Sequence, residues 1–218
     1  MTPFGTLSTS EFQRLTLHRV TQLRSTSGVI EQALKTHTSL MRNEFSDIAI
    51  ALPRSVAAEL AAHLEEEVDE VEGAFTQGIR AALLTLAWST FEVDLDLLCQ
   101  ILAEQTSVRL RPNDLAGKGI VRSRNFLKKV LGVSFPDQSP VWDSIKRLNE
   151  LRNVIVHRAS RLIVSEDQNL RKFISTWPSI TIENEQLRFS PAFLPATFDT
   201  VEAFWKELFA LLVSGNEL

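Results

Sequence analysis

The feature that most constrains the fold is a long segment, residues 53–105, which contains no proline after Pro53. Pro53 stands where a helix tolerates proline, in the first turn. The large apolar residues beyond it recur every three or four positions, as on a buried helix face: Leu84, Trp88, Phe91, Leu95, Leu98 and Leu102. Gly73 and Gly78 are the expected places for a bend or a break. The segment therefore predicts one long helix, and with it a helical bundle.

Most of the remaining chain also has helical apolar spacing. We expect helices over about 10–43, 121–131, from 141 onwards and over 197–213, with loops at 109–119 and 136–140. Ser25, Ser27 and Gly28 mark a place where the first helix could be interrupted. Residues 180–189 instead alternate between apolar and polar around Asn184-Glu185, which predicts a small β-hairpin. The fold class is therefore all-α, with residues 1–52 as a helical extension packed on a domain of residues 53–218.

Composition excludes several classes of protein. Hydrophobic residues make up 44% of the 218 residues and charged residues 23%, so the chain is not globally disordered. Cys99 is the only cysteine, which excludes an internal disulfide and a zinc ribbon and favours a reducing, cytoplasmic location. The most apolar stretch, residues 81–88, is too short to cross a membrane, and the N-terminus lacks the pattern of a signal peptide.

The charge is unevenly distributed along the chain. Ten basic and three acidic residues lie between Lys118 and Arg161, so this stretch carries +7 although the whole chain carries −4. A basic segment inside an acidic protein is a candidate phosphate-facing surface. Solvated helix faces would give the same pattern, so both interpretations stay open at this point.

The sequence contains none of the common nucleotide-binding or hydrolase motifs. Phosphate-loop, dinucleotide-binding, HExxH and GxSxG patterns are all missing. No two of the four histidines have a spacing that would place them on one helix face, so we expect no metal site and no cofactor. Cys99 lies in a leucine-rich helical pattern, where a thiol is usually inert packing rather than a nucleophile.

One short segment, residues 151–158 (LRNVIVHR), combines polar groups suited to binding an anion. Arg152 is the only arginine that lies five residues before a histidine. On a helix, Asn153 and His157 lie one above the other, and the long side chain of Arg152 can reach towards them. We expect Val154, Ile155 and Val156 to supply packing. The simpler alternative is that Arg152 and His157 are ordinary surface residues.

On these residues the chain resembles the HEPN superfamily, whose members share a helical bundle with long antiparallel helices and an Arg-x4–6-His motif. The residue after the arginine is often asparagine in that motif, as Asn153 is here. The resemblance covers roughly residues 57–218 and includes the helix at 82–98, the basic segment at 122–132 and the motif segment at 139–160. Many HEPN proteins are metal-independent endoribonucleases that act as toxins of toxin–antitoxin pairs or as anti-phage or CRISPR-associated nucleases.

The resemblance implies RNA cleavage by the 2′-OH group, which gives a 2′,3′-cyclic phosphate and a 5′-OH. Such a reaction needs a base, an acid and a cationic donor for the phosphoryl oxygens. Histidine titrates near neutral pH and the guanidinium fork suits phosphate, so His157 and Arg152 are the candidate catalytic residues, with Asn153 orienting His157 or the phosphate. Because each chain offers one suitable histidine, a homodimer with a composite site at the two-fold axis is expected.

The basic segment and the resemblance also suggest further contacts and partners. Lys146, Arg158 and Arg161 are candidate contacts to the RNA backbone, with surface solvation as the alternative. Glu92 could approach the motif helix or belong to a solvated edge with Asp96. An antitoxin or a defence-system partner is expected, and no membrane.

Three functions remain open on the sequence alone. They are a ribonuclease, a non-catalytic HEPN module that binds RNA or a nucleotide or serves as a dimeric scaffold, and a plain helical interaction protein with an accidental motif. In some HEPN toxins a tyrosine two residues after the histidine is modified by a partner nucleotidyltransferase. Here that position is Ala159 and the chain has no tyrosine, so this type of neutralisation is excluded.

Overall fold

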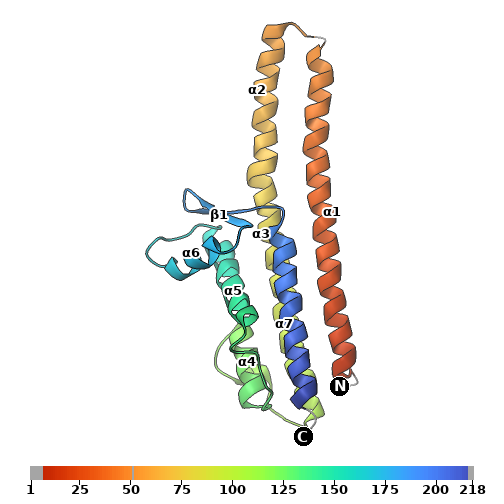
Figure 1. The fold of residues 1–218 in the computed structure, drawn as a ribbon, viewed down its shortest axis with the longest axis vertical. Coiled ribbons are helices and arrows are strands. Elements are labelled where there is room, and N and C mark those ends of the chain that lie inside the picture. The colour runs from red at the N-terminus through yellow and green to blue at the C-terminus, as the bar shows by residue number, and fades with distance from the viewer. Residues whose placement is uncertain (1–6, 51, 216–218) are drawn as a thin grey trace.

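The fold is an all-α bundle with one small hairpin, seen in a computed structural model that describes residues 7–50 and 52–215 (Figure 1). Helix α1 (Thr9–Ile50) runs antiparallel to α2 (Arg54–Glu70) and α3 (Thr76–Gln105). A π-helical turn, η1 (Val71–Phe75), joins α2 to α3, so the helix predicted over 53–105 is confirmed. Residues 1–6, part of the segment in which we expect no signal peptide, lie outside the described residues.

The glycines and serines thought able to interrupt the long helices have smaller effects. Helix α1 continues through Ser25, Ser27 and Gly28, and the Ser27 hydroxyl donates within the helix to the Arg24 carbonyl at 2.8 Å. Gly73 lies in η1, which widens the helix by one residue without ending it. Gly78 lies inside α3, which runs on unbroken because a single glycine weakens a helix by only about 1 kcal/mol.

The remaining elements complete the bundle. They are η2 (Pro112–Asp114), α4 (Gly119–Lys129), α5 (Pro140–Arg158), α6 (Gln168–Ser175), β1 (Ile180–Glu183), β2 (Gln186–Phe189) and α7 (Phe193–Gly215). Helix α7 packs against both α1 and α3. The predicted hairpin is confirmed, and its turn residues Asn184 and Glu185 both have positive φ, as a two-residue turn requires. The sequence did not predict α6, which has eight residues and buries only Leu170 and Ile174.

One hydrophobic core joins α1, α3, α5 and α7. Phe91 of α3 packs edge-on against Phe204 and Trp205 of α7, with ring centroids 5.4 and 5.5 Å apart. Phe12 of α1 is fully buried, and its ring packs edge-on against Trp205 and Phe209, with both pairs of ring centroids 6.2 Å apart. Helix α1, which belongs to the predicted extension, therefore shares its core with α3 and α7. None of the described helices has the length and apolarity to span a bilayer.

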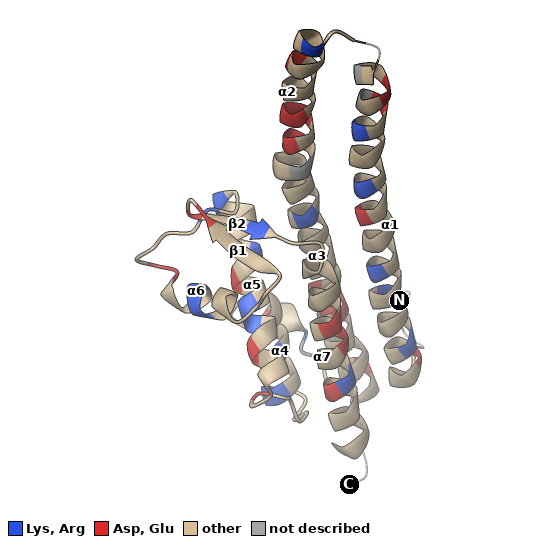
Figure 2. Ribbon diagram, turned by 45° about the horizontal axis from the view of Figure 1, so that its top comes forward, with Lys and Arg blue, Asp and Glu red and all other residues tan. Residues whose placement is uncertain are grey.

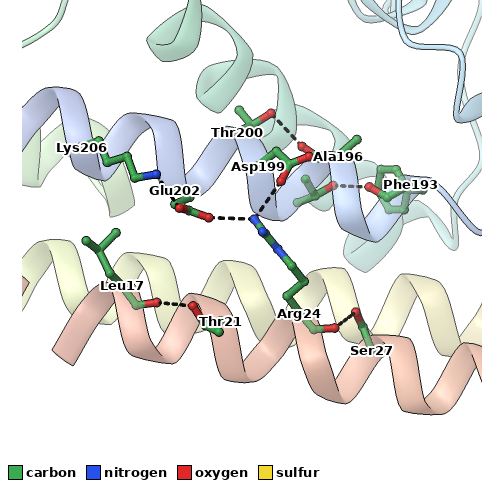
Figure 3. Close-up of polar contacts among 11 residues, drawn as sticks. Leu17, Thr21, Arg24, Ser27, Phe193, Ala196, Asp199, Thr200, Glu202 and Lys206 are labelled. Carbon is green, nitrogen blue, oxygen red and sulfur yellow. Dashed lines mark hydrogen bonds and ion pairs between the residues drawn. The ribbon is translucent and has the colours of Figure 1, made fainter. Parts of the chain in front are cut away.

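Ion pairs also hold α1 against the bundle. The guanidinium of Arg24 donates to Glu202 of α7 at 2.9 Å and pairs with Asp199 at 2.8 Å (Figure 3). Arg19 of α1 pairs with the buried Asp94 of α3. Burial raises the pKa of Asp94 to about 6, because the loss of hydration outweighs the attraction of Arg19.

We expect Phe12→Ala to lower the free energy of unfolding by about 3–5 kcal/mol, since the change empties an aromatic position in a closed core. Urea denaturation of the full chain measures this difference. Val29→Ala, at a position on the same helix that is 67% exposed, is the control and should change stability by no more than about 0.5 kcal/mol. A Phe12→Ala loss as small as that of the control would show that α1 is not part of the core.

Candidate functional site

Helix α5 carries the predicted motif and fixes which of its side chains reach solvent. The helix begins at Pro140, and the Ser139 hydroxyl caps it by accepting from the Val141 N–H at 3.1 Å. Its core-facing residues are buried: Trp142, Ile145, Leu148, Leu151 and Val154. Arg152 and Asn153 are half-buried, whereas His157 is exposed in the last turn. The helix therefore presents the motif's polar groups outside the core.

The expected packing role of the three apolar motif residues is wrong for one of them. Val154 is buried and Ile155 is partly buried against the core, but Val156 is 46% exposed. Residues two positions apart on a helix are separated by about 200° around its axis, so Val156 points away from the face on which Val154 packs.

The structure brings two of the three candidate catalytic residues into contact. Arg152 Nη1 donates to Asn153 Oδ1 at 3.1 Å. Arg152 Nε is buried and has no hydrogen-bond partner. His157 lies one turn beyond Asn153 and makes no hydrogen bond or ion pair with any described residue. The arginine and the asparagine are therefore positioned together, and the histidine is free to meet another group.

Most of the basic segment is neutralised by neighbouring carboxylates. In the described part of the chain, seven of its ten cations are within 4 Å of an acidic side chain: Arg122, Arg124, Lys128, Lys146, Arg147, Arg158 and Arg161. Figure 2 shows the resulting mixture of acidic and basic residues along α4 and α5. Lys118, Lys129 and Arg152 are the three without such a partner. The +7 of this segment is therefore not an open basic surface.

Arg158, one of the three candidate RNA contacts, is held in a structural ion pair. Its two terminal nitrogens donate to the two carboxylate oxygens of Asp167, both at 2.8 Å. Asp167 also accepts from the Ile163 N–H at 2.6 Å. The hydrogen bond from Arg158 holds the pKa of Asp167 below its usual value, and the same bond raises the pKa of Arg158. This pair fixes the loop after α5, and a phosphate would have to displace Asp167.

The other two candidate RNA contacts have carboxylate partners too, but they are more exposed. Lys146 pairs with Asp143 at 2.6 Å, and Arg161 pairs with Glu185 at 3.5 Å. The side chain of Arg161 is 69% exposed. Exposed pairs of this kind contribute little stability, so they can exchange one anion for another more easily than Arg158.

Glu92 and Cys99 lie at the contact between α3 and α4. A Cβ atom at Gly119, the first residue of α4, would be 2.6 Å from Glu92 Oε1, so Glu92 lies beside the start of that helix. Cys99 is buried, and burial together with the nearby Asp96 raises the pKa of its thiol. The interpretation of Cys99 as inert packing agrees with this environment.

Asp167 is the residue of this region that the sequence did not single out. It lies nine positions after Arg158, in a loop, at the N-cap of α6. No helical spacing relates the two residues. Because α6 was not predicted, nothing in the sequence signalled this pair, and the Asp167 side chain makes no hydrogen bond that caps α6.

No group of three histidine, cysteine, aspartate or glutamate side chains is arranged to bind a metal among the described residues. Arg152, Asn153 and His157 all lie in the last two turns of α5, where Arg152 contacts Asn153 and His157 is exposed. Comparison with known proteins adds no further evidence: the chain matches no family model, no curated protein and no solved structure.

Proposed function

We propose that the protein is a metal-independent endoribonuclease of the HEPN type that acts as a toxin or a phage-defence effector in the cytoplasm. The observation that carries this proposal is the state of Arg152. It lies in a segment whose cations are mostly paired, yet it has no carboxylate partner among the described residues. It contacts Asn153, on the helix that exposes His157 one turn further on.

An unpaired arginine suits the binding of a phosphate that changes charge during a reaction. Arg158 would have to break two hydrogen bonds to Asp167 before its fork could bind phosphate. Arg152 has only the neutral Asn153 oxygen as its partner. Its guanidinium can therefore meet the non-bridging phosphoryl oxygens and stabilise the charge that grows on them in the transition state.

His157 supplies the proton transfer in this proposal. One imidazole takes the proton of the ribose 2′-OH while O2′ attacks phosphorus, and the bond from phosphorus to O5′ breaks. A second imidazole, in the cationic form, donates its proton to the leaving O5′. Because His157 is exposed and has no partner in the described chain, a second copy related by a two-fold axis is proposed to provide that second group.

The proposal is tested by incubating the purified protein with total RNA in the presence of EDTA. We expect cleavage, because no step of the reaction requires a metal ion. A second reaction with magnesium in place of EDTA is the control. Cleavage that occurs only with magnesium would contradict the mechanism. RNA that is bound but intact in both reactions would favour the non-catalytic HEPN binding module.

A further inference from the structure

A cavity of about 580 Å³ lies beside the carboxyl end of α5. Its walls come from the end of α2, the start of α3, the residues just after α5, and β2. The polar residues that line it are Asp69, Glu70, Gln77, Ser160, Gln186 and Arg188, and the amide of Gln77 is already hydrogen-bonded to the backbone of Phe189. Neither the proposed reaction nor the packing of the core uses this cavity.

The cavity is close to the proposed catalytic histidine. Ala159 and Ser160 line it, and they directly follow His157 and Arg158 in the chain. Two residues of chain span at most about 7 Å, so the backbone of His157 lies within that distance of the cavity wall at Ala159. A nucleotide whose phosphate binds at His157 could therefore place its base in the cavity.

The polar groups of the cavity favour a ligand rich in N–H donors over a phosphate. The carboxylates of Asp69 and Glu70 make no hydrogen bond or ion pair with any described residue. Inside the cavity these two carboxylates would repel a phosphate and attract N–H groups. Gln186 and Ser160 add donors at the same cavity, and so does Arg188, whose Nε also pairs with Glu183 at 3.4 Å.

We propose that this cavity binds a guanine base, and that it reads the base next to the cleaved phosphate; the second part rests on the proposed ribonuclease function. Guanine presents two adjacent donors, N1–H and the N2 amino group, which match the two oxygens of one carboxylate. Its O6 accepts from a donor such as Arg188 or Gln186. Adenine, cytosine and uracil each place an acceptor beside their donor, so a carboxylate would face a lone pair.

The helix wall leaves room for a flat ring. A Cβ atom added at Gly73 or Gly78 would meet no atom within 4 Å, so both positions open onto free space. Gly73 belongs to the π-helical turn η1, and turns of this kind are frequent at functional sites. Gly78 lines the cavity, so we expect a large side chain at this position to take up space in it.

Binding of 5′-GMP to the full chain, measured by calorimetry, tests the cavity without relying on RNA cleavage. We expect wild type to bind GMP roughly tenfold or more tightly than AMP, CMP or UMP. Gly78→Leu should weaken GMP binding by roughly tenfold or more, while its helix becomes no less stable because leucine is the better helix former. Gly28→Leu, at another helical glycine with open space around it, is the matched control and should bind GMP as wild type does.

The outcomes separate this proposal from the ribonuclease proposal. If RNA is cut but GMP binds no better than AMP, or binds Gly78→Leu as well as wild type, the cavity proposal is overturned and the ribonuclease stands. If GMP binds selectively and RNA is not cut, the ribonuclease falls and a guanine site remains. Mapping the cut sites completes the test. If wild type cuts next to guanine and Gly78→Leu loses this preference, base reading is confirmed. If the cuts are unrelated to guanine, base reading is overturned, and the cavity is a site for a free guanine nucleotide instead.

Discussion

Replacement of His157 by alanine is expected to abolish RNA cleavage without unfolding the protein. Loss of one general acid–base group typically slows a reaction by a factor of roughly 10²–10⁴, and in the proposed dimer site both copies are lost together. The fold should persist because His157 is exposed and forms no hydrogen bond or ion pair with the described residues. The initial rate of cleavage of a labelled RNA, together with the thermal midpoint, measures both parts of this prediction.

His63→Ala is the matched control for that variant. His63 is also exposed and lies on α2, where it is 3.9 Å from Glu67. The control should cleave RNA at the wild-type rate. If His157→Ala were as active as His63→Ala, His157 would have no part in the chemistry and the proposed site would be wrong.

Arg152→Ala should lower the cleavage rate by a factor of roughly 10²–10³, the usual effect of removing one donor from a developing oxyanion. Arg152→Lys should recover only part of this loss, because an ammonium group keeps the charge but lacks the planar fork. Both variants should fold, since Arg152 forms no ion pair with a described carboxylate. Single-turnover cleavage rates of the two variants give the comparison.

Arg14→Lys provides the control for the arginine-to-lysine change. Arg14 is exposed on α1 and belongs neither to the motif nor to the candidate RNA contacts, so the change should leave the rate near that of wild type. Full activity in Arg152→Lys would show that Arg152 acts only as a positive charge. Full activity in Arg152→Ala would remove it from the site altogether.

The helical period of the sequence was enough to predict the main architecture. The long helix that ends at Gln105 and the hairpin around Asn184 both follow from the spacing of apolar residues and from turn chemistry. Helix α6 was missed because eight residues hold only about two turns and two buried side chains. The continuity of α1 through Gly28 was not predictable locally, because it depends on packing against α3 and α7.

The candidate site was predictable only where its residues share one helix. Arg152 and Asn153 are in contact within α5, whereas His157, which was expected to converge with them, makes no hydrogen bond with either residue. The pairing of Arg158 with Asp167 was not predictable, because the chain must first fold back after α5. The cavity was not predictable either. In the sequence, Asp69 and Glu70 look like part of a solvated acidic helix face, and only the folded chain places the end of α2 beside β2.

The ends of the RNA fragments that wild-type protein produces in EDTA test the central proposal most directly. Attack by the 2′-OH leaves a 2′,3′-cyclic phosphate on one fragment and a 5′-OH on the other, and mass spectrometry of a short defined RNA distinguishes these ends from all others. The ribonuclease proposed here predicts both ends in EDTA, and their loss in His157→Ala. Fragments that carry a 5′-phosphate and a 3′-OH, or fragments that form only when magnesium is present, would contradict it.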